Sequence, residues 1–513
     1  MNIQELCKQY ASRPQVKALA KALGNEQERR ISLEGLLGSS APLVFAALSK
    51  CEARGASCGN TILFVLNDAE EAGYFYHDLT QLMGEGSVLF FPSSYRRSVK
   101  YAQRDAANEI LRTETLTALS SKREGLYIVS YPEAVAEMVV TRKRLDSRTL
   151  TLRMGQTIGT ATIEQTLQDF GFREVDYVYE PGQYALRGSI LDVYSFSSEF
   201  PFRIDFFGDE IDSIRTFEVE NQLSKDRRER VDIVPELAGE TEDKESLLTF
   251  LPEQTLLCSK DYTYVADVVD RTYQEGFSRQ AVTERMEEAE SEMEQHEIEQ
   301  MLRRESQLIT GAQFRADSER FRRIVLRGHS GTEVRGCEII FNMKAQPLFH
   351  KNFDLLAQTL EDYVLQGYQL FILADSQKQQ ERLKDILDEK RLTFVPVDKT
   401  LHEGFIDTDA RACFLTDHQI FDRFHKYNLR SDKARTGKMA LTLKEIQQFE
   451  IGDYVVHVDH GVGKFGGLVR MPIANSQQPT ANSQQYQEMI KIIYQRGDAI
   501  YVSIHSLYKV SKY

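Results

Sequence analysis

The sequence predicts an α/β multidomain protein, and three observations support this prediction. At 513 residues the chain is too long for one hydrophobic core, since domains typically run to about 150 residues. Short apolar runs alternate with helical patterns over much of the chain, as in a sheet covered by helices. In the middle of the chain and again at its end, the residue pattern changes to that of alternating strands separated by glycine turns. We therefore expect separate α/β and all-β units.

Residues 1–148 are predicted to form the first part of a parallel sheet with the pattern of a nucleotide-binding fold. The apolar runs TILFVL, SVLFFP and GLYIVS are short enough for buried strands and are separated by helical stretches. Two further runs, LTFLP and TLLCS, follow the middle of the chain. We expect the sheet to resume there, so that residues 236–350 form its second part. Within them, the Met spacing of 277–308 predicts a long surface helix.

Residues 149–235 are predicted to be an inserted, mainly antiparallel domain, because turn signals separate its short alternating strands. In the stretch FPFRIDFFGDEIDSI, a period of two separates the side chains onto two faces. The apolar face receives Phe202, Ile204 and Phe206. The other face receives Arg203, Asp205 and Phe207. The upstream strand QYALRGSILDVY adds Arg187, and pairing of the two strands would bring both arginines near the exposed aromatic ring.

The polar face of this predicted sheet has two interpretations. An aromatic side chain beside arginines has the composition of a protein-interface hot spot. Alternatively, Phe207 is a core residue at a bulge before Gly208, and the arginines pair with nearby acids. The pattern alone favours neither interpretation.

Residues 351–445 are predicted to form a second, small α/β domain and a linker. The helical pattern DLLAQTLEDYVLQ precedes the apolar strand YQLFILAD, and a second helix and a strand ACFLTD follow. A basic, polar stretch at 430–438 then separates this domain from the end of the chain.

Residues 446–513 are predicted to be all-β, since they are dense in Val, Ile, Tyr and Gly turns. EMIKIIYQRGDAIYVSI has the pattern of a hairpin that turns at Arg496, Gly497 and Asp498. Its first strand is apolar on both faces, with Ile490, Ile492 and Tyr494 on one and Lys491 and Ile493 on the other. Such a strand can join a partner's sheet by its edge, although core packing would also explain it. The repeated ANSQQ at 474–485 predicts a disordered hairpin loop.

Net charge and targeting signals exclude several classes of protein. The formal net charge of −14 is opposite to that of a domain that wraps nucleic acid. The basic stretch at 142–153 is interpreted as a solvated linker or strand face rather than a phosphate track. The first residues lack the features of an export signal, and no apolar run approaches the ~20 residues of a membrane span, so we expect a cytoplasmic protein. The six cysteines form no C-x-x-C pair that would indicate a zinc site.

The sequence contains no motif to which we would assign catalysis. A phosphate loop needs G-x-x-x-x-G-K-[ST], but the best-placed stretch, LLGSSAPLVF, puts Val44 and Phe45 where Lys and Ser/Thr belong. The two histidines of HVDH at 457–460 point to opposite faces of an alternating strand, so we interpret them as structural. We therefore predict no catalytic, cofactor-binding or metal-binding residue in this chain.

Two motifs resemble a known family. The stretch EPGQYALRGSILDVYSFSSEFPFRIDFFGDEIDSIRTFEVENQLS resembles the motif shared by the UvrB repair helicase and the transcription-repair coupling factor (Mfd) family. The stretch FEIGDYVVHVDHGVGKFGGL resembles the CarD-like RNA polymerase-interacting domain. Together and in this order, the motifs resemble those of the N-terminal, non-motor region of the coupling factors. The resemblance implies a UvrB-like module at 1–350, a variable domain after it, and a Tudor-like barrel at the end.

The resemblance implies two partners and assigns residues to each. The inserted domain of the family binds UvrA, and the matching positions here are Arg187, Arg203 and Phe207. The family's barrel binds the RNA polymerase β subunit through a strand edge, which implies contacts at Ile490, Lys491 and Ile492.

The resemblance also implies where the family's catalysis lies. Complete coupling factors carry an ATP- and Mg-dependent DNA translocase further along the chain, and no such motif occurs before Tyr513, so we expect this chain to be a non-enzymatic adaptor. The degenerate loop at 38–45 agrees with the nucleotide binding that the family's UvrB-like module has lost. The alternatives are an ATP-dependent UvrB-like helicase and a CarD-like transcription regulator.

Overall fold

The computed structural model divides the chain into two units, which are described separately. One unit consists of residues 1–150 and 234–428, and the other of residues 151–233 and 429–513. The structure describes 1–51, 61–84, 86–94, 106–121, 123–219, 222–237, 244–277, 307–327, 336–389, 391–423, 452–457, 461–472, 486–494, 498–503 and 510–512. The predicted surface helix at 277–308 (apart from its ends), the ANSQQ repeats, His460 and the turn residues Arg496 and Gly497 lie outside these residues.

A seven-stranded sheet, parallel throughout, forms the centre of the first unit, as the apolar runs predicted. Its strand order is β17-β1-β16-β15-β2-β4-β3. Strands β2, β3, β4 and β15 are buried at every position, which explains why they are apolar runs rather than alternating patterns. The strand bounds are β1 Arg30–Glu34, β2 Ile62–Val65, β3 Val88–Phe91, β4 Tyr127–Ser130, β15 Leu256–Ser259, β16 Arg322–Arg327 and β17 Cys337–Ile340.

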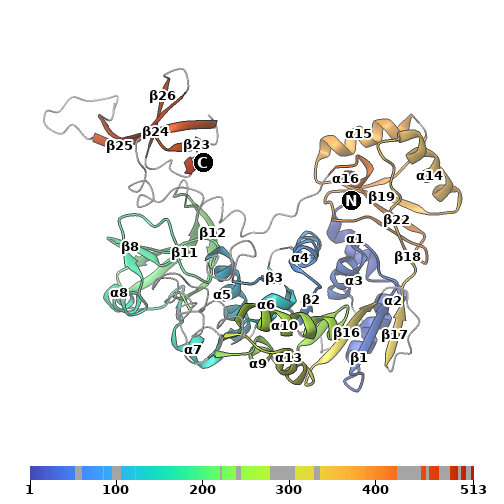
Figure 1. Cartoon of the computed structure of the whole chain (residues 1–513), viewed down its shortest axis with the longest axis horizontal. Helices are drawn as coiled ribbons and strands as arrows, with labels where there is room; N and C mark the ends of the chain where they lie inside the picture. The colour runs from blue at the N-terminus through green and yellow to red at the C-terminus, as the bar shows by residue number, and fades with distance from the viewer. Residues whose placement is uncertain are drawn as a thin grey trace. The chain divides into compact units, whose positions relative to one another are not determined.

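Helices pack around this sheet in two groups (Figure 1). Helices α1, α3 and α4 contact one another, and α6, α10 and α13 form a second group. Helix α3 is buried along most of its length, which matches its apolar sequence SAPLVFAALS. The helix bounds are α1 Ile3–Tyr10, α2 Pro14–Gly24, α3 Ser40–Ser49, α4 Ala69–Met83, α5 Ala106–Ser120, α6 Pro132–Ala136, α7 Arg142–Ser147, α9 Leu247–Phe250, α10 Tyr262–Phe277 and α13 Gly311–Ser318. A short ladder joins β5 Val139–Val140 to β14 Lys244–Glu245.

A second α/β sheet completes this unit, with the order β18-β21-β22-β19-β20. The predicted boundary at 351 is too late, because β18 already pairs antiparallel with β21. This pairing joins segments about 60 residues apart and leaves no periodic signal in the sequence. The bounds are β18 Met343–Ala345, α14 Phe353–Leu365, β19 Gln369–Leu373, α15 Gln377–Asp388, β20 Val395–Val397, β21 Phe405–Asp407, β22 Ala412–Thr416 and α16 Asp417–Ile420.

The N-terminal helices attach this second sheet to the first unit. The Tyr10 hydroxyl donates a hydrogen bond of 2.5 Å to Asp407, and the Ile3 amide donates one of 2.8 Å to Asp398. Figure 1 shows the N-terminus beside the sheet that carries α14, α15 and α16. The two α/β sheets therefore belong to one folded unit, although some of their strands are about 300 residues apart in the sequence.

The inserted domain is built on a six-stranded sheet with the order β12-β11-β10-β9-β8-β7. Only β7 and β8 run parallel, and the other neighbours are antiparallel. A register shift between β10 and β11 lies at Asp205 and Phe206. The bounds are β6 Leu150–Arg153, α8 Thr160–Asp169, β7 Arg173–Glu174, β8 Gln183–Arg187, β9 Ile190–Val193, β10 Phe202–Phe207, β11 Glu210–Phe217, β12 Ser224–Arg228 and β13 Arg230–Ile233.

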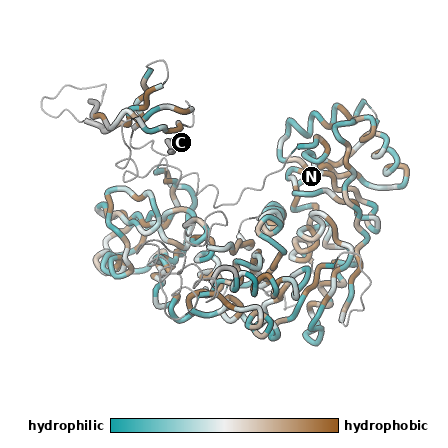
Figure 2. Tube along the Cα trace, viewed as in Figure 1, coloured by the Kyte–Doolittle hydropathy of each residue, from teal (hydrophilic) through white to brown (hydrophobic). Residues whose placement is uncertain are grey.

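The C-terminal residues form a five-stranded antiparallel sheet with the order β26-β25-β24-β23-β27. The predicted hairpin is present as the antiparallel pair β25 and β26. In this sheet, as in the others, hydrophobic stretches of the trace follow strands (Figure 2). The bounds are β23 Tyr454–His457, β24 Gly461–Pro472, β25 Tyr486–Ile493, β26 Ala499–Ser503 and β27 Val510–Lys512.

Candidate partner-binding surfaces

One face of the inserted sheet carries the three residues predicted to contact UvrA. Ile190 of β9 pairs with Arg187 of β8 on one side and with Asp205 of β10 on the other. Side chains of directly paired residues lie on the same face of a sheet, and residues two apart on a strand share that face. The structure therefore places Arg187, Arg203 and Phe207 on one face.

A buried carboxylate joins the two arginines on this face. Asp192 is fully buried and accepts hydrogen bonds from Arg203 Nε at 2.7 Å and Arg203 Nη2 at 2.9 Å. Arg187 Nη2 forms an ion pair with the same carboxylate. These hydrogen bonds raise the pKa of the Arg203 guanidinium above its ordinary value. The Asp192 carboxylate contacts both guanidinium groups, so each arginine has an ionic partner, and one of the two positive charges remains in excess.

The planes of both guanidinium groups are fixed by further contacts. Arg203 Nη1 donates to the carbonyl of Gln222 at 3.1 Å, and the group lies over the ring of Phe217 at 4.6 Å. Arg187 Nη1 donates to the carbonyl of Asp176 at 2.7 Å, and its group lies over the ring of Tyr177 at 5.0 Å. Both side chains are thus held in one orientation before any partner binds.

Phe207 is exposed, which excludes the interpretation that it is a core residue. Its side chain is 83% accessible at the end of β10, where it pairs with Glu210 across a two-residue turn. Gly208 in this turn has φ +63°, a conformation that glycine adopts without strain. The tip is held by a 2.8 Å hydrogen bond from the Ile158 amide to the Asp209 carbonyl. A large apolar ring therefore projects from a fixed hairpin.

Sequence reasoning missed three residues of this face. Asp192 is the acid of the otherwise apolar strand ILDV, and its place on the arginine face could have indicated a partner for them. Tyr177 and Tyr179 lie on the segment before β8 and are 50% and 43% exposed. Their position beside Arg187 depends on how this segment folds back, which no periodic pattern reports.

The C-terminal sheet corrects the prediction for Ile490 and Ile492. Both side chains are buried, at 1% and 0% exposure, in a core formed with Val455, Phe465 and Val502. Strand β25 also pairs with β24 on one side and β26 on the other, so it offers no free edge at these residues. The prediction that these two side chains contact a partner is therefore wrong. The period of two identified a buried face correctly, but it could not report the position of the strand in the sheet.

Lys491 and its neighbour on β26 lie on the other face of the C-terminal sheet. Lys491 is half-buried and pairs directly with Tyr501, which is 43% exposed. Within the residues that the structure describes, β26 pairs only with β25 and so has one open edge. This edge can accept a strand of another protein.

Comparison with known proteins finds matches for the two domains that carry these surfaces. Residues 150–238 match the family model of the UvrB interaction domain, and residues 449–513 match that of the CarD-like/TRCF RID domain. The predicted resemblance to transcription-repair-coupling factors is confirmed. The chain is 23% identical to the transcription-repair-coupling factor of Staphylococcus aureus (strain USA300) over 89% of its length, and 24% identical to that of Staphylococcus haemolyticus (strain JCSC1435) over 88%. It spans 43% of the length of each relative.

In the first unit, the loop at the position of a phosphate loop is in contact with another segment of the same chain. The Ser39 amide donates to the Glu403 carbonyl at 3.2 Å, and the Glu403 amide donates back to Ser39 Oγ at 2.9 Å. A side chain at Gly38 would lie 3.1 Å from the Gly404 carbonyl. The Leu37 amide is also occupied, by Ser40 Oγ at 2.9 Å. The Leu37 and Ser39 amides, which could otherwise donate to a phosphate, therefore have partners within the protein.

Asp78 of helix α4 stabilises this contact. Its carboxylate accepts hydrogen bonds from Ser39 Oγ at 2.5 Å and from the His402 amide at 2.7 Å. The ring of His402 stacks on Tyr74 with 3.4 Å between centroids. Burial raises the pKa of Asp78 to about 7, and the nearby Glu403 adds to this rise. The carboxylate is thus held in a site that disfavours its charge.

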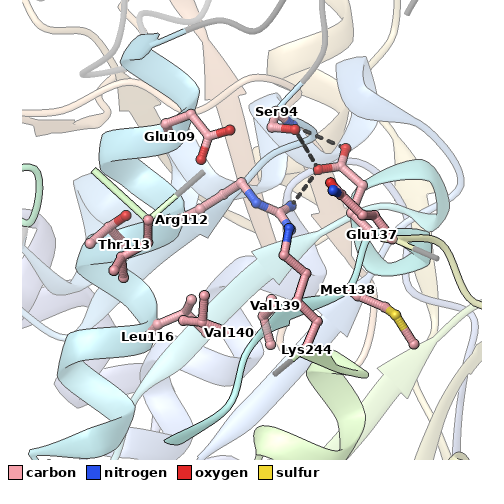
Figure 3. A pocket seen from close by; sticks show the side chains of 12 residues that line it. Ser94, Glu109, Arg112, Thr113, Leu116, Glu137, Met138, Val139, Val140 and Lys244 are labelled. Carbon is pink, nitrogen blue, oxygen red and sulfur yellow. Dashed lines mark hydrogen bonds and ion pairs between the residues drawn. The ribbon is translucent and has the colours of Figure 1, made fainter. Parts of the chain in front are cut away.

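A pocket at the end of β3 contains a second buried network (Figure 3). Arg112 and Glu137 form an ion pair of 3.4 Å, and Glu137 accepts hydrogen bonds from the Ser94 amide and hydroxyl at 3.0 and 2.7 Å. Arg112 Nη1 also donates to the Pro92 carbonyl at 2.8 Å. These groups satisfy one another, so the network ties β3 to α5 and α6 rather than presenting reactive side chains.

Within the described ranges, no three His, Cys, Asp or Glu side chains gather closely enough to hold a metal ion. Nor does any described helix combine the length and apolar character that crossing a bilayer requires.

Proposed function

We propose that this chain is the non-motor adaptor part of a transcription-repair coupling factor, which binds stalled RNA polymerase and recruits UvrA for transcription-coupled nucleotide excision repair. One observation supports this most strongly. The chain combines a match to the UvrB interaction domain with a match to the CarD-like/TRCF RID domain. An adaptor needs two separate binding surfaces, and the two matches support one for each partner.

The proposal assigns UvrA to the face formed by Arg187, Arg203 and Phe207. An exposed aromatic ring beside oriented arginines is the composition of an interface hot spot. Because Asp192 and backbone carbonyls already hold the guanidinium groups, little side-chain freedom is lost on binding.

The proposal assigns the polymerase β subunit to the C-terminal sheet, which closes into a Tudor-like barrel in this proposal. The open edge of β26, with Tyr501 and the neighbouring Lys491, supports edge-to-edge addition of a β-subunit strand.

The adaptor is proposed to act in the cytoplasm without a cofactor or catalysis of its own. ATP, Mg and the DNA translocase activity belong, in this proposal, to a motor region of a complete coupling factor, through which DNA is engaged. The filled phosphate-loop position argues against the alternative of an ATP-dependent UvrB-like helicase. The match at 150–238 argues against a free-standing CarD-like regulator.

Pull-down experiments with purified UvrA and purified RNA polymerase test the proposed function. The intact 513-residue chain should retain both proteins, separately and together. Binding of neither partner at micromolar concentration would overturn the adaptor function. Retention of polymerase with no UvrA would instead favour a CarD-like regulator.

A further inference from the structure

We propose that Tyr177 and Tyr179 extend the UvrA-binding face beyond Arg187, Arg203 and Phe207, so that the partner contacts an aromatic strip along the segment before β8. This inference rests on the proposed function, whose binding face it enlarges.

The path of the segment turns both tyrosines outward. Val178 between them is fully buried in a small core with Ala185, Tyr194 and Phe217. Tyr177 and Tyr179 are 50% and 43% exposed. Because Val178 packs in this core, the backbone is anchored there while the rings of both neighbouring tyrosines stay exposed.

Three hydrogen bonds hold this segment in place. Arg187 Nη1 donates to the Asp176 carbonyl at 2.7 Å, and Gln222 Nε2 donates to the Val178 carbonyl at 3.3 Å. The Tyr179 amide donates to Gln183 Oε1 at 2.9 Å. Since the rings are carried by a fixed backbone, few degrees of freedom are lost when a partner covers them.

The tyrosines are continuous with the predicted UvrA contacts. The Arg187 guanidinium lies over the Tyr177 ring at 5.0 Å. Desolvation by burial, followed by the nearby Tyr177, raises the pKa of the Tyr179 phenol, so its hydroxyl stays a hydrogen-bond donor at neutral pH. Half-exposed tyrosines next to an oriented arginine match the anchors that dominate protein interfaces.

The charges of this face fit a protein partner rather than nucleic acid. Asp192 pairs with Arg187 and Arg203, and Asp205 pairs with Arg215. Binding of a phosphate backbone depends on cations whose charge is not already neutralised. Each of these three guanidinium groups is already paired with one of two carboxylates, which leaves a small positive excess on an aromatic face. This combination suits the surface of another protein, and UvrA is the partner to which we assign it.

Affinity measurements with purified UvrA test this extension. Tyr179→Ala should weaken binding by about 10-fold without lowering the unfolding temperature, since the removed ring is half-exposed. The matched control is Tyr264→Ala on α10, which removes a ring of similar exposure, 44%, from the other unit and should leave the affinity unchanged. Phe207→Ala serves as the reference for the face already assigned.

The outcomes separate the extension from the function on which it rests. Wild-type affinity of Tyr179→Ala, together with a loss of binding in Phe207→Ala, would overturn the extension and leave the proposed function intact. Absence of UvrA binding by the unmodified chain would overturn both.

Chemical nitration of the unmodified chain provides a second measurement that needs no variant. Bound UvrA should protect Tyr177 and Tyr179 from nitration, while Tyr264 should react as it does in the free chain. Equal nitration of all three tyrosines with and without UvrA would overturn the extension even if Tyr179→Ala failed to fold.

Discussion

Arg203 holds the fully buried carboxylate of Asp192 through both Nε and Nη2, at 2.7 and 2.9 Å. Arg203 is therefore a structural residue as well as a proposed partner contact. We expect Arg203→Ala to destabilise the inserted domain by about 2 to 3 kcal/mol, because Asp192 keeps only the ion pair with Arg187. Calorimetry of the full chain should show that the unfolding transition of the inserted domain lies at a lower temperature in Arg203→Ala than in the unmodified chain. An unchanged transition would mean that the ion pair does not support the fold.

Phe207→Ala is the cleaner test of UvrA binding. The ring is 83% exposed, so its removal should change the free energy of unfolding by less than about 0.5 kcal/mol. If the ring is a hot spot, loss of about 2 kcal/mol should weaken UvrA binding roughly 30-fold. Titration calorimetry with purified UvrA measures the affinity. Equal affinity of the variant and the unmodified chain would remove Phe207 from the proposed face.

Ile492→Arg should unfold the C-terminal sheet rather than remove one contact. Ile492 is completely buried beside Ile490 and Phe465, and an unpaired guanidinium there would cost several kcal/mol. Tyr501→Ala on β26 should leave the sheet folded, because this ring is 43% exposed. Limited proteolysis followed by mass spectrometry compares the two. Equal protease resistance of Ile492→Arg and Tyr501→Ala would contradict the burial described for β25.

Asp78 should make the first unit less stable as the pH rises. Its pKa is raised to about 7 in the folded state, so the folded protein binds this proton more tightly than the unfolded chain does. The resulting stability is complete below about pH 4 and is lost as the pH rises to about 7. The groups that face Asp78 are Ser39, His402 and Glu403, with Tyr74 stacked on the histidine.

An Asp78→Asn variant isolates this contribution. Between pH 5 and pH 8 the unfolding temperature of the unmodified chain should fall relative to that of the variant, which has no carboxylate to ionise at this site. Asp362→Asn, at an exposed position of α14, is the control and should follow the unmodified chain. Parallel pH profiles for the unmodified chain and Asp78→Asn would argue against a raised pKa.

Magnesium and ATP should not stabilise this chain. Stabilisation by a ligand grows with its concentration relative to its dissociation constant, and the loop donors at Leu37 and Ser39 are already bonded within the protein. Thermal unfolding with and without about 5 mM MgATP should give the same midpoint. A rise of several degrees would restore nucleotide binding as a function of the first sheet.

The periodicity of the sequence predicted which side chains of a strand share a face, but it did not predict which strands lie beside one another. The alternation of β10 correctly separated Ile204 from Arg203, because one face of this sheet is buried. It could not identify Asp192, since the hydrogen bonds depend on the register between two strands. The same limit explains the error at Ile492: whether a strand is central or at an edge depends on pairings between distant segments.

The contact of residues 402–404 with Ser39 and Asp78 determines how the chain can be shortened. A truncation after residue 342 would remove β18 to β22, so that the Tyr10 hydroxyl would lose Asp407 and the Asp78 carboxylate would keep Ser39 but lose the His402 amide. Such a fragment would expose the polar groups that contact β18 to β22 in the longer chain, together with the apolar surfaces around them. Exposed apolar surface favours aggregation. A shortened chain that keeps the hydrogen bonds of Asp78 and Tyr10 should therefore include β18 to β22.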